Sequence, residues 1–373
     1  MASRGAQIIL LTHWTLDDPF LTDYIDDLRT STSNELITAE HVDLASLHSI
    51  RLFATKWIDN APPRRLDTLI LCANTLTPRG GAVQISDDGV ESNYAINYLA
   101  NFHLLSILSP ALRAQPPDRD VRIIFGTCSS YLGGSLPSSS DEDVPMPTPL
   151  KPKKKQSTPG AHKPLHTTHP SATYSSSKLA LMTFASAFQK HLSSYIRPDK
   201  NPVTAKVLLV DPGYTRTPGM RRYLTFGSLW GLLLYLLTYP IWWLILKSPE
   251  QGAQTFLYAA MDARFAREAG GVGGVGGVGG MQEAVLLKEC REYKIMRSEV
   301  GDEAAQKMLW EGTERAIERL EKEGAVRRAA GKKEKEKEKE DVGEGARTTA
   351  TANVNANGNG ERKAGSRRTR KAA

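Results

Sequence analysis

Cysteine is scarce in this chain: only Cys72, Cys128 and Cys290 occur among 373 residues. Their odd number and wide spacing exclude a disulfide framework and fit a reducing compartment. The eight histidines show no zinc-type spacing either. We therefore predict no metal site.

An excess of positive charge is missing from most of the chain. The formal net charge is +7, but residues 321–373 hold 15 lysines and arginines against 9 acidic residues, which accounts for +6 of it. No interleaved basic and aromatic surface accompanies this charge, so we predict no nucleic-acid partner. The Lys/Glu-rich and Asn/Gly-rich composition predicts a disordered basic tail over residues 326–373.

Two further segments lack the pattern of a packed structure. Residues 135–170 contain eight prolines, a serine run and three consecutive lysines, and we predict a disordered insertion there. Residues 270–280 repeat glycine and valine, which predicts a flexible loop. The rest of residues 1–325 has the composition of one folded domain.

That domain alternates short apolar runs with amphipathic stretches. Ile8–Leu11 is too short for a signal-peptide core and predicts a first strand. Continuous apolar strands between amphipathic helices are typical of a parallel sheet covered on both faces. We expect an α/β, doubly wound fold with strands at 6–12, before Glu40, 66–72, 121–125 and 205–210. Helices are expected at 18–30, 45–60, 90–112, from about 174, and 298–323 with Ser298 as its N-cap. The family resemblance described below implies that this fold is Rossmann-like.

One uncharged apolar stretch stands out at residues 224–246. It is 23 residues long, which is enough to span a bilayer. Pro240 interrupts it, and basic residues at both ends (Arg221, Arg222 and Lys247) give it no preferred orientation. Its tryptophans and tyrosines are typical of an interfacial element. We predict a kinked or hairpin segment lying in one lipid leaflet, with a true span and a buried helix pair as the alternatives.

Tyr174 and Lys178 form a Tyr-x-x-x-Lys pattern within a predicted helix. Side chains four residues apart lie on one helix face, so both can reach one small site. A nearby ammonium favours the phenolate and lowers the tyrosine pKa. The pair is thus suited to proton transfer in carbonyl–alcohol chemistry, whereas an exposed polar helix face is the plainer alternative.

Together with the strand order, several motifs resemble the short-chain dehydrogenase/reductase family over roughly residues 5–325. The similarity is greatest to the fungal membrane- or lipid-droplet-associated oxidoreductases near the retinol dehydrogenases. The matching segments are Val42-Asp43-Leu44, Leu71-Cys-Ala-Asn-Thr75, Ala95-Ile-Asn97-Tyr-Leu-Ala-Asn-Phe102, the Tyr174/Lys178 pair and Asp211-Pro212-Gly213-Tyr-Thr-Arg-Thr217.

The resemblance implies a role for each motif. Tyr174 would transfer the proton, Lys178 would lower its pKa and hold the nicotinamide ribose, and Asn97 would hold a water in the proton relay. The residues implied to line the cofactor are Asp43, Leu44, Cys72, Ala73, Asn74, Tyr174, Lys178, Pro212, Gly213 and Thr217. His13 stands where an arginine often contacts the 2′-phosphate of NADP, which leaves both NAD and NADP open.

The family also uses a serine that hydrogen-bonds the substrate oxygen. In strict register Cys128 falls on this position, and Ser129 and Ser130 follow at once. A shift by one residue is easy at a strand end. We favour Ser129, then Ser130.

One family element is missing from the sequence, the Thr-Gly-x-x-x-Gly-x-Gly turn that binds the pyrophosphate. Arg4–Thr12 matches the family's second strand, so the first βα unit has no counterpart here. Since that first strand lies at the centre of the family's sheet, we expect two exposed strand edges. A truncated gene product explains this better than a cofactor-poor descendant, because every later motif persists.

The resemblance implies an NAD(P)-dependent oxidoreductase that interconverts a lipid, sterol or retinoid-like carbonyl and its alcohol. We expect it at a lipid-droplet or endoplasmic-reticulum membrane surface, with the catalytic domain facing the cytosol, and the family's usual homodimer would use the 90–112 and 174–192 helices. The alternative is a non-catalytic lipid-droplet or membrane-associated protein that retains the fold.

Overall fold

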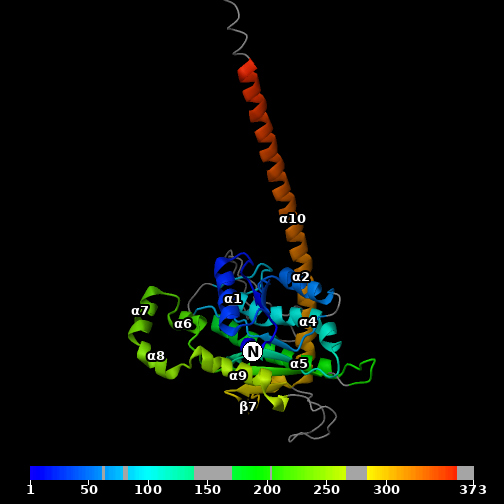
Figure 1. The fold of residues 1–373 in the computed structure, drawn as a ribbon, viewed down its shortest axis with the longest axis vertical. Coiled ribbons are helices and arrows are strands. Elements are labelled where there is room, and N and C mark those ends of the chain that lie inside the picture. Colours follow the sequence, from blue (N-terminus) through cyan, green and yellow to red (C-terminus); the bar gives the residue numbers. More distant parts are fainter. Residues whose placement is uncertain (61–63, 79–82, 138–169, 202–203, 266–283, 359–373) are drawn as a thin grey trace, which may run out of the picture. The chain divides into compact units, whose positions relative to one another are not determined.

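The computed structural model describes residues 1–60, 64–78, 83–137, 170–201, 204–265 and 284–358 (Figure 1). The chain divides into two units, Met1–Arg319 and Leu320–Ala373, and each is described by itself. The predicted loop at 270–280 and all but the ends of the predicted insertion at 135–170 lie outside the described residues.

The strands of the first unit form two sheets. Strand β1 (Ile8–Thr12) pairs in parallel with β2 (Ile37–His41). The second sheet has the order β3-β4-β5-β6-β7, parallel except for the last pair. Its strands are β3 (Thr68–Leu71), β4 (Val121–Gly126), β5 (Ala205–Asp211), β6 (Val285–Lys288) and β7 (Arg291–Tyr293). The five predicted strands are confirmed, and the β6–β7 pair was not predicted.

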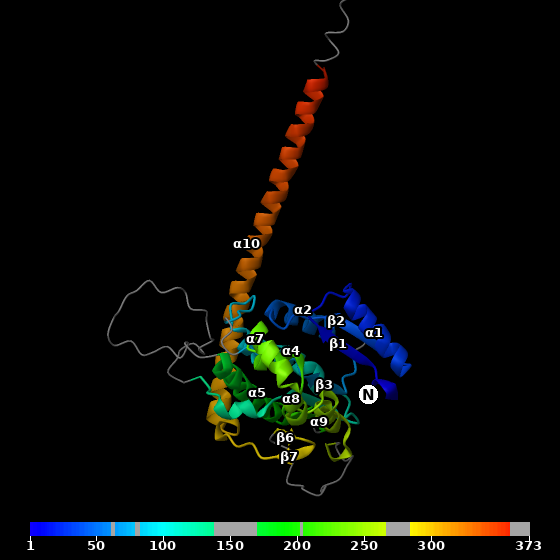
Figure 2. The same cartoon turned by 90° about the vertical axis from the view of Figure 1, so that its left-hand side faces the viewer.

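Strands β1 and β3 each have only one hydrogen-bonded neighbour among the described strands (Figure 2). Leu11 on β1 and Ile70 on β3 are both 37% exposed, unlike the fully buried strand residues of β4 and β5. Within the described residues β1 and β3 therefore each leave an edge unpaired, in agreement with the two exposed edges expected from the sequence.

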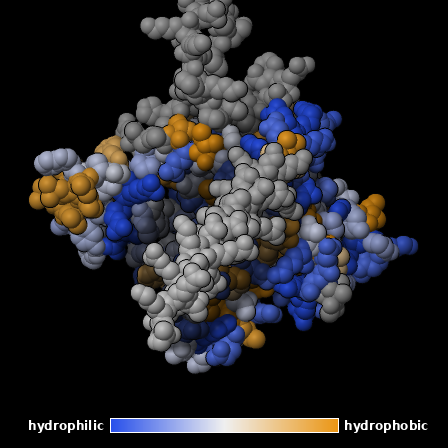
Figure 3. Space-filling view, turned by 90° about the horizontal axis from the view of Figure 1, so that it is seen from above, coloured by the Kyte–Doolittle hydropathy of each residue, from blue (hydrophilic) through white to orange (hydrophobic). Residues whose placement is uncertain are grey.

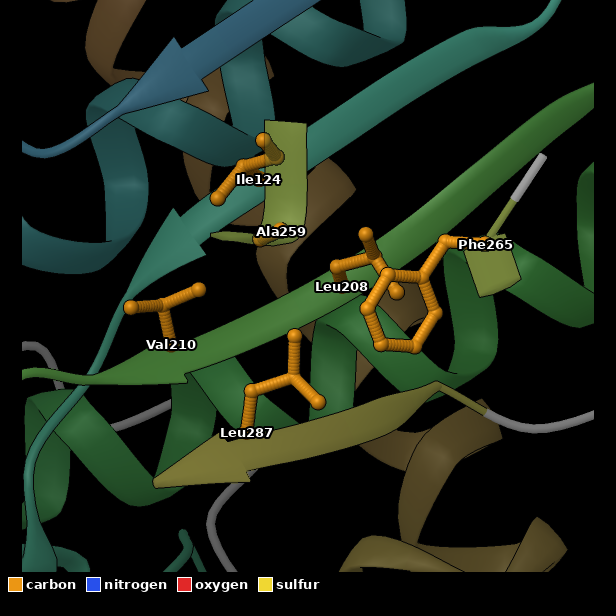
Figure 4. Close-up of a cluster of buried hydrophobic side chains, with 6 residues drawn as sticks. All are labelled: Ile124, Leu208, Val210, Ala259, Phe265 and Leu287. Carbon is orange, nitrogen blue, oxygen red and sulfur yellow. The ribbon is translucent and has the colours of Figure 1, made fainter. Parts of the chain in front are cut away.

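Helices cover the second sheet on both faces, which confirms the doubly wound arrangement. One face packs beneath α9 (Pro249–Met261), where Ile124, Leu208 and Leu287 meet Ala259 and Phe265 (Figure 4). Each of these side chains is almost wholly removed from water. The stretches Ile123–Phe125 of β4 and Val207–Val210 of β5 are continuous apolar runs because both of their faces are buried.

The opposite face packs beneath α4 (Ala100–Arg113) and α5 (Pro170–Ser193). Phe125 of β4 contacts Phe184 of α5, and Phe184 contacts Phe102 of α4. Trp310 of α10 completes this aromatic cluster, with ring centroids 5.3 Å from Phe102 and 5.6 Å from Phe184. The helix pair that the resemblance assigned to a homodimer therefore packs against a helix of its own chain.

Helix α10 (Glu303–Gly358) differs from the sequence prediction at both ends. Ser298 begins a short 3₁₀ turn (Ser298–Val300), and the carboxylate of Asp302 instead accepts the backbone N–H groups of Ala304 and Ala305. The helix also continues through residues 326–358, for which disorder was predicted. The Lys/Glu alternation there consists of good helix formers, which explains the difference.

The apolar stretch at 224–246 folds as two short helices, α7 (Leu229–Leu237) and α8 (Tyr239–Ile245), which follow α6 (Pro218–Leu224). The break falls at Thr238, and Pro240 occupies the first turn of α8, where its missing N–H costs nothing. Among the described residues, no helix is long and apolar enough to cross a membrane. We call α7 and α8 together the apolar hairpin.

Two helices precede the segment that carries Asn97. Helix α1 (Pro19–Thr32) packs against β2, and α2 (Leu47–Ile58) packs against α4. The chain then reaches α4 through a single helical turn, α3 (Ser92–Tyr94), and a π-helical segment at Ala95–Leu99. The irregular segment is part of the candidate site.

Candidate active site

Helix α5 brings Tyr174 and Lys178 to the carboxyl end of β4. The ammonium nitrogen of Lys178 lies 5.8 Å from the centre of the Tyr174 ring and donates to the Gly126 carbonyl oxygen at 3.0 Å. Lys178 is only 2% exposed. Its burial lowers its pKa, which the nearby Cys128 and Asp211 oppose.

The phenol of Tyr174 faces the loop that follows β4. Its oxygen lies 3.3 Å from the sulfur of Cys128, which in turn lies 2.8 Å from the hydroxyl oxygen of Ser130. Burial raises the pKa of Tyr174, Cys128 adds to that shift, and a hydrogen bond with Asn74 opposes it. The sequence had predicted a lowered pKa. A phenol keeps its proton at neutral pH even at its ordinary pKa of about 10, and this shift acts in the same direction, toward the form that can donate a proton.

Ser129, the serine favoured from the sequence, takes part in a different set of contacts. Its hydroxyl donates to a carboxylate oxygen of Asp211 at 2.6 Å and accepts from the ammonium of Lys288 at 3.0 Å. The structure thus brings Cys128 to Tyr174, with Ser130 against the Cys128 thiol, and points the hydroxyl of Ser129 toward β5 and β6.

Asn97 lies in the π-helical segment that precedes α4 and is fully buried. Its amide oxygen accepts from the backbone N–H of Thr75 at 2.8 Å, and its amide nitrogen donates to the Thr75 carbonyl at 3.0 Å and to Ser177 at 3.2 Å. A π-helical turn inside a helix often marks a functional site. Asn97 thus connects the loop after β3 to α5, because it contacts both Thr75 and Ser177. Ser177 is three residues after Tyr174.

The Pro212–Gly213 turn follows β5 and faces the same edge of the sheet. Gly213 has a φ of +76°, a conformation that favours glycine. Its backbone N–H donates to Asp211 at 2.9 Å. Thr217 caps α6 by accepting from the backbone N–H of Met220 at 3.3 Å.

The remaining predicted cofactor residues lie at the carboxyl ends of β2 and β3. Asp43 and Leu44 follow β2, and a carboxylate oxygen of Asp43 accepts from the backbone N–H of Ala45 at 2.8 Å. The other three, Cys72, Ala73 and Asn74, follow β3. In open α/β sheets ligands bind along this edge.

These residues fit the two ends of a nicotinamide dinucleotide. The buried ammonium of Lys178 and the Pro212–Gly213 turn suit the nicotinamide end, and the carboxylate of Asp43 suits the adenine end. Between them, this sequence contains no glycine-rich phosphate turn. The residues that would hold the dinucleotide therefore lie at its nicotinamide end and at its adenine end.

Two charged residues of the site were missed. Asp211 begins the Pro-Gly motif, but its own role is not evident from the sequence. Lys288 ends an apolar run, Val285-Leu-Leu, that would have indicated β6. Among the described residues, no group of three or more histidine, cysteine or acidic side chains is placed to hold a metal ion.

Comparison with known proteins places the chain in a family. No family model matches the sequence. The chain is 38% identical to an uncharacterized oxidoreductase, pbr1, of Schizosaccharomyces pombe over 87% of this chain and 78% of the relative. It is 29% identical to human retinol dehydrogenase 13 over 72% of this chain and 69% of the relative. It is 32% identical to mouse polyprenol dehydrogenase over 64% of this chain and 60% of the relative.

The sheet order, the Tyr174/Lys178 pair and these relatives define an oxidoreductase with a Rossmann-like fold. The chain belongs to the NAD(P)-dependent short-chain dehydrogenase/reductase family, near the retinol dehydrogenases.

Proposed function

We propose that the protein interconverts a lipid-soluble carbonyl compound and its alcohol, with Tyr174 as the group that transfers the proton. The observation that carries this proposal is the half-buried phenol of Tyr174, whose oxygen lies 3.3 Å from the Cys128 sulfur and whose ring centre lies 5.8 Å from the Lys178 ammonium. The names of two relatives support the substrate class, since retinol and polyprenol are both long isoprenoid alcohols.

Each residue of the site has a defined task in this reaction. Tyr174 donates its proton to the carbonyl oxygen during reduction and takes it back during oxidation. Cys128 lies 3.3 Å from the phenol oxygen and hydrogen-bonds the same substrate oxygen, while Ser130 contacts the thiol at 2.8 Å and holds it in place. A bound nicotinamide, NAD or NADP, supplies the hydride. The buried charge of Lys178 holds the ribose and keeps the Tyr174 ring in place.

Asn97 acts through the scaffold around the pair. Its contacts with Thr75 and Ser177 hold the loop after β3 at a fixed distance from α5. The hydroxyl of Ser177 donates to the Tyr174 carbonyl at 2.7 Å, so the chain of contacts ends at the catalytic residue itself. We propose that this arrangement also holds the water of the proton relay.

The apolar hairpin supplies the contact with lipid. Leu229, Trp230 and Leu237 are each at least 80% exposed, and Leu244 and Ile245 of α8 are 80% and 61% exposed. A hydrophobic patch stands out at the left of the molecule in Figure 3, on the side where the hairpin lies in Figure 1. Contiguous apolar surface of this kind is rare on soluble monomers and marks an interaction site. Arg221 and Arg222 precede it, as suits anionic head groups, whereas Lys247 after it pairs with Glu289 at 2.6 Å. We propose that the hairpin lies in one leaflet of the endoplasmic-reticulum membrane or in the monolayer of a lipid droplet, with the catalytic domain in the cytosol.

A homodimer through α4 and α5 also stays a proposal. Trp310 occupies part of that surface, so such a dimer would form beside α10.

A second candidate function is a membrane-bound protein that keeps the fold but lacks catalysis. The exposed apolar surface of the hairpin favours it, because that surface would serve membrane attachment without any turnover. Isothermal titration with NADPH and NADH, followed by an assay of retinaldehyde reduction in vesicles, separates the two. We expect binding and formation of the alcohol. Absence of nicotinamide binding would support the non-catalytic protein, and reduction of small polar carbonyls alone would refute the lipid substrate.

A further inference from the structure

Ser129, Asp211 and Lys288 form a polar cluster beside the Tyr174 site. Each comes from a different element: the loop after β4, the end of β5 and the end of β6. The Ser129 hydroxyl lies 2.6 Å from a carboxylate oxygen of Asp211 and 3.0 Å from the Lys288 ammonium. Lys288 lies 4.0 Å from the same Asp211 oxygen, so the three side chains contact one another in a ring.

The cluster joins the two turns that face the substrate position. The other carboxylate oxygen of Asp211 accepts the backbone N–H of Gly213 at 2.9 Å, which holds the Pro212–Gly213 turn. Ser129 lies between Cys128 and Ser130, whose side chains contact each other next to Tyr174. Holding Ser129 therefore also holds the two residues on either side of it.

Burying the carboxylate of Asp211 costs free energy, because the charge is removed from water. Its side chain is 5% exposed, and a buried carboxylate is tolerated only with charged and hydrogen-bonding partners. Lys288 is its direct neighbour across the β5–β6 pair, and that ammonium also lies 5.4 Å from the centre of the Tyr293 ring of β7. The β6–β7 pair thus supplies the countercharge.

The charge of Asp211 also reaches the catalytic pair. It raises the pKa of Lys178 and, as a smaller contribution, that of Tyr174. The cluster is thus coupled to the site by position and by charge.

We propose that Ser129, Asp211 and Lys288 are positioning residues that fix the loop carrying Cys128 and Ser130 against the Pro212–Gly213 turn. This role serves the proposed function, but the cluster can be tested without turnover. The readout is the position of the Cys128 thiol, which a chain with no reductase activity would report equally well.

The experiment measures alkylation of Cys128 by iodoacetamide, resolved by peptide mass spectrometry, in the full chain and in Ser129→Ala and Asp211→Asn. Freeing the loop should accelerate alkylation of Cys128 about tenfold, the factor that corresponds to losing one hydrogen bond to a charged group. Cys72, which lies outside the cluster, is the internal reference and should change less than about twofold. Ser129→Thr keeps the hydroxyl and should restore the wild-type rate.

A matched control is Asp120→Asn, which removes a carboxylate that pairs with Arg122 at 2.6 Å beside the opposite end of β4. It should leave the Cys128 rate unchanged. If Asp211→Asn does not fold, Ser129→Ala decides alone, because it removes only one oxygen. Wild-type Cys128 reactivity in folded Ser129→Ala would overturn the proposal, and so would an equal acceleration at Cys72.

Discussion

The phenol oxygen of Tyr174 lies 3.3 Å from the sulfur of Cys128, whereas the hydroxyl of the next residue, Ser129, bonds to Asp211. Cys128 has an extended backbone, and Ser129 begins a 3₁₀ turn over Ser129–Gly133, so the chain changes direction between the two residues. The Cys128 side chain therefore faces Tyr174, whereas that of Ser129 faces Asp211. A thiol occupies the place beside the phenol where the family's serine hydroxyl was expected.

Replacing Tyr174 by phenylalanine should abolish most of the turnover. The loss should be about 10²–10⁴-fold in kcat, the usual contribution of a proton-transfer group. The free energy of unfolding should hardly change, because the ring stays in place. The matched control is Tyr214→Phe, whose ring is 68% exposed. Equal kcat values for the two variants would exclude Tyr174 from the chemistry.

Variants of Cys128 should show whether Cys128 or Ser129 hydrogen-bonds the substrate oxygen. Cys128→Ala should lower kcat about 100-fold, as loss of one preorganised donor does. Cys128→Ser should keep or raise kcat, since a hydroxyl is a stronger donor than a thiol. Cys290→Ser is the control. A larger loss in kcat for Ser129→Ala than for Cys128→Ala would contradict this assignment.

Much of this site was predictable, because its residues lie either directly after apolar strands or on helices with clear apolar periodicity. Tyr174, Lys178 and Asn97 lie on helices whose position is set by apolar periodicity, and the structure brings all three together. The choice between Cys128 and Ser129 was not predictable, because it depends on which way one residue turns at a strand end. Lys288 was missed since the β6–β7 pair is short and follows a glycine-rich segment.

The apolar hairpin should carry the binding to lipid. Leu233 and Leu237 are 58% and 80% exposed, so Leu233→Lys with Leu237→Lys should leave the fold intact. Vesicle flotation should show at least about a tenfold loss of binding, since burying each leucine is worth about 1.5–3 kcal/mol.

The control for the hairpin uses exposed apolar residues elsewhere. Leu52 and Ile196 are 59% and 86% exposed, and changing both to lysine should leave flotation unchanged. If the two double variants float equally well, the hairpin is not the lipid contact.

Trp310→Ala should destabilise the first unit strongly. The ring packs against Phe102, Phe184 and Phe188, and its loss should cost about 3–5 kcal/mol in urea denaturation. Trp230→Ala, at a ring that is 81% exposed, should change the free energy by less than about 0.5 kcal/mol. A small effect at Trp310 would mean that α10 is not part of the core.

The Arg297–Glu299 pair should give stability that depends on pH. Arg297 hydrogen-bonds Glu299 and so lowers the pKa of its carboxyl from 4.5 to about 2. Because the folded value is the lower one, the stabilisation is present above about pH 4.5 and is lost as the pH falls toward about 2. The pair is partly exposed, so the contribution should be below about 1 kcal/mol.

Urea denaturation of Glu299→Gln at pH 7 and at pH 3 measures that contribution. The difference in unfolding free energy from the wild type should shrink at the lower pH. Glu303→Gln, at a side chain that is 86% exposed, should show no such trend. A difference that grows toward acid would have the wrong sign for this pair.

The most direct measurement follows one deuterium atom. The protein on vesicles that contain retinaldehyde is given NADPH or NADH deuterated at the nicotinamide C4 position, and the lipid product is examined by mass spectrometry. We predict deuterium on the carbinol carbon with the wild type and at least about 100-fold less product with Tyr174→Phe. Nicotinamide binding without deuterium transfer, or equal transfer in both proteins, would contradict the account.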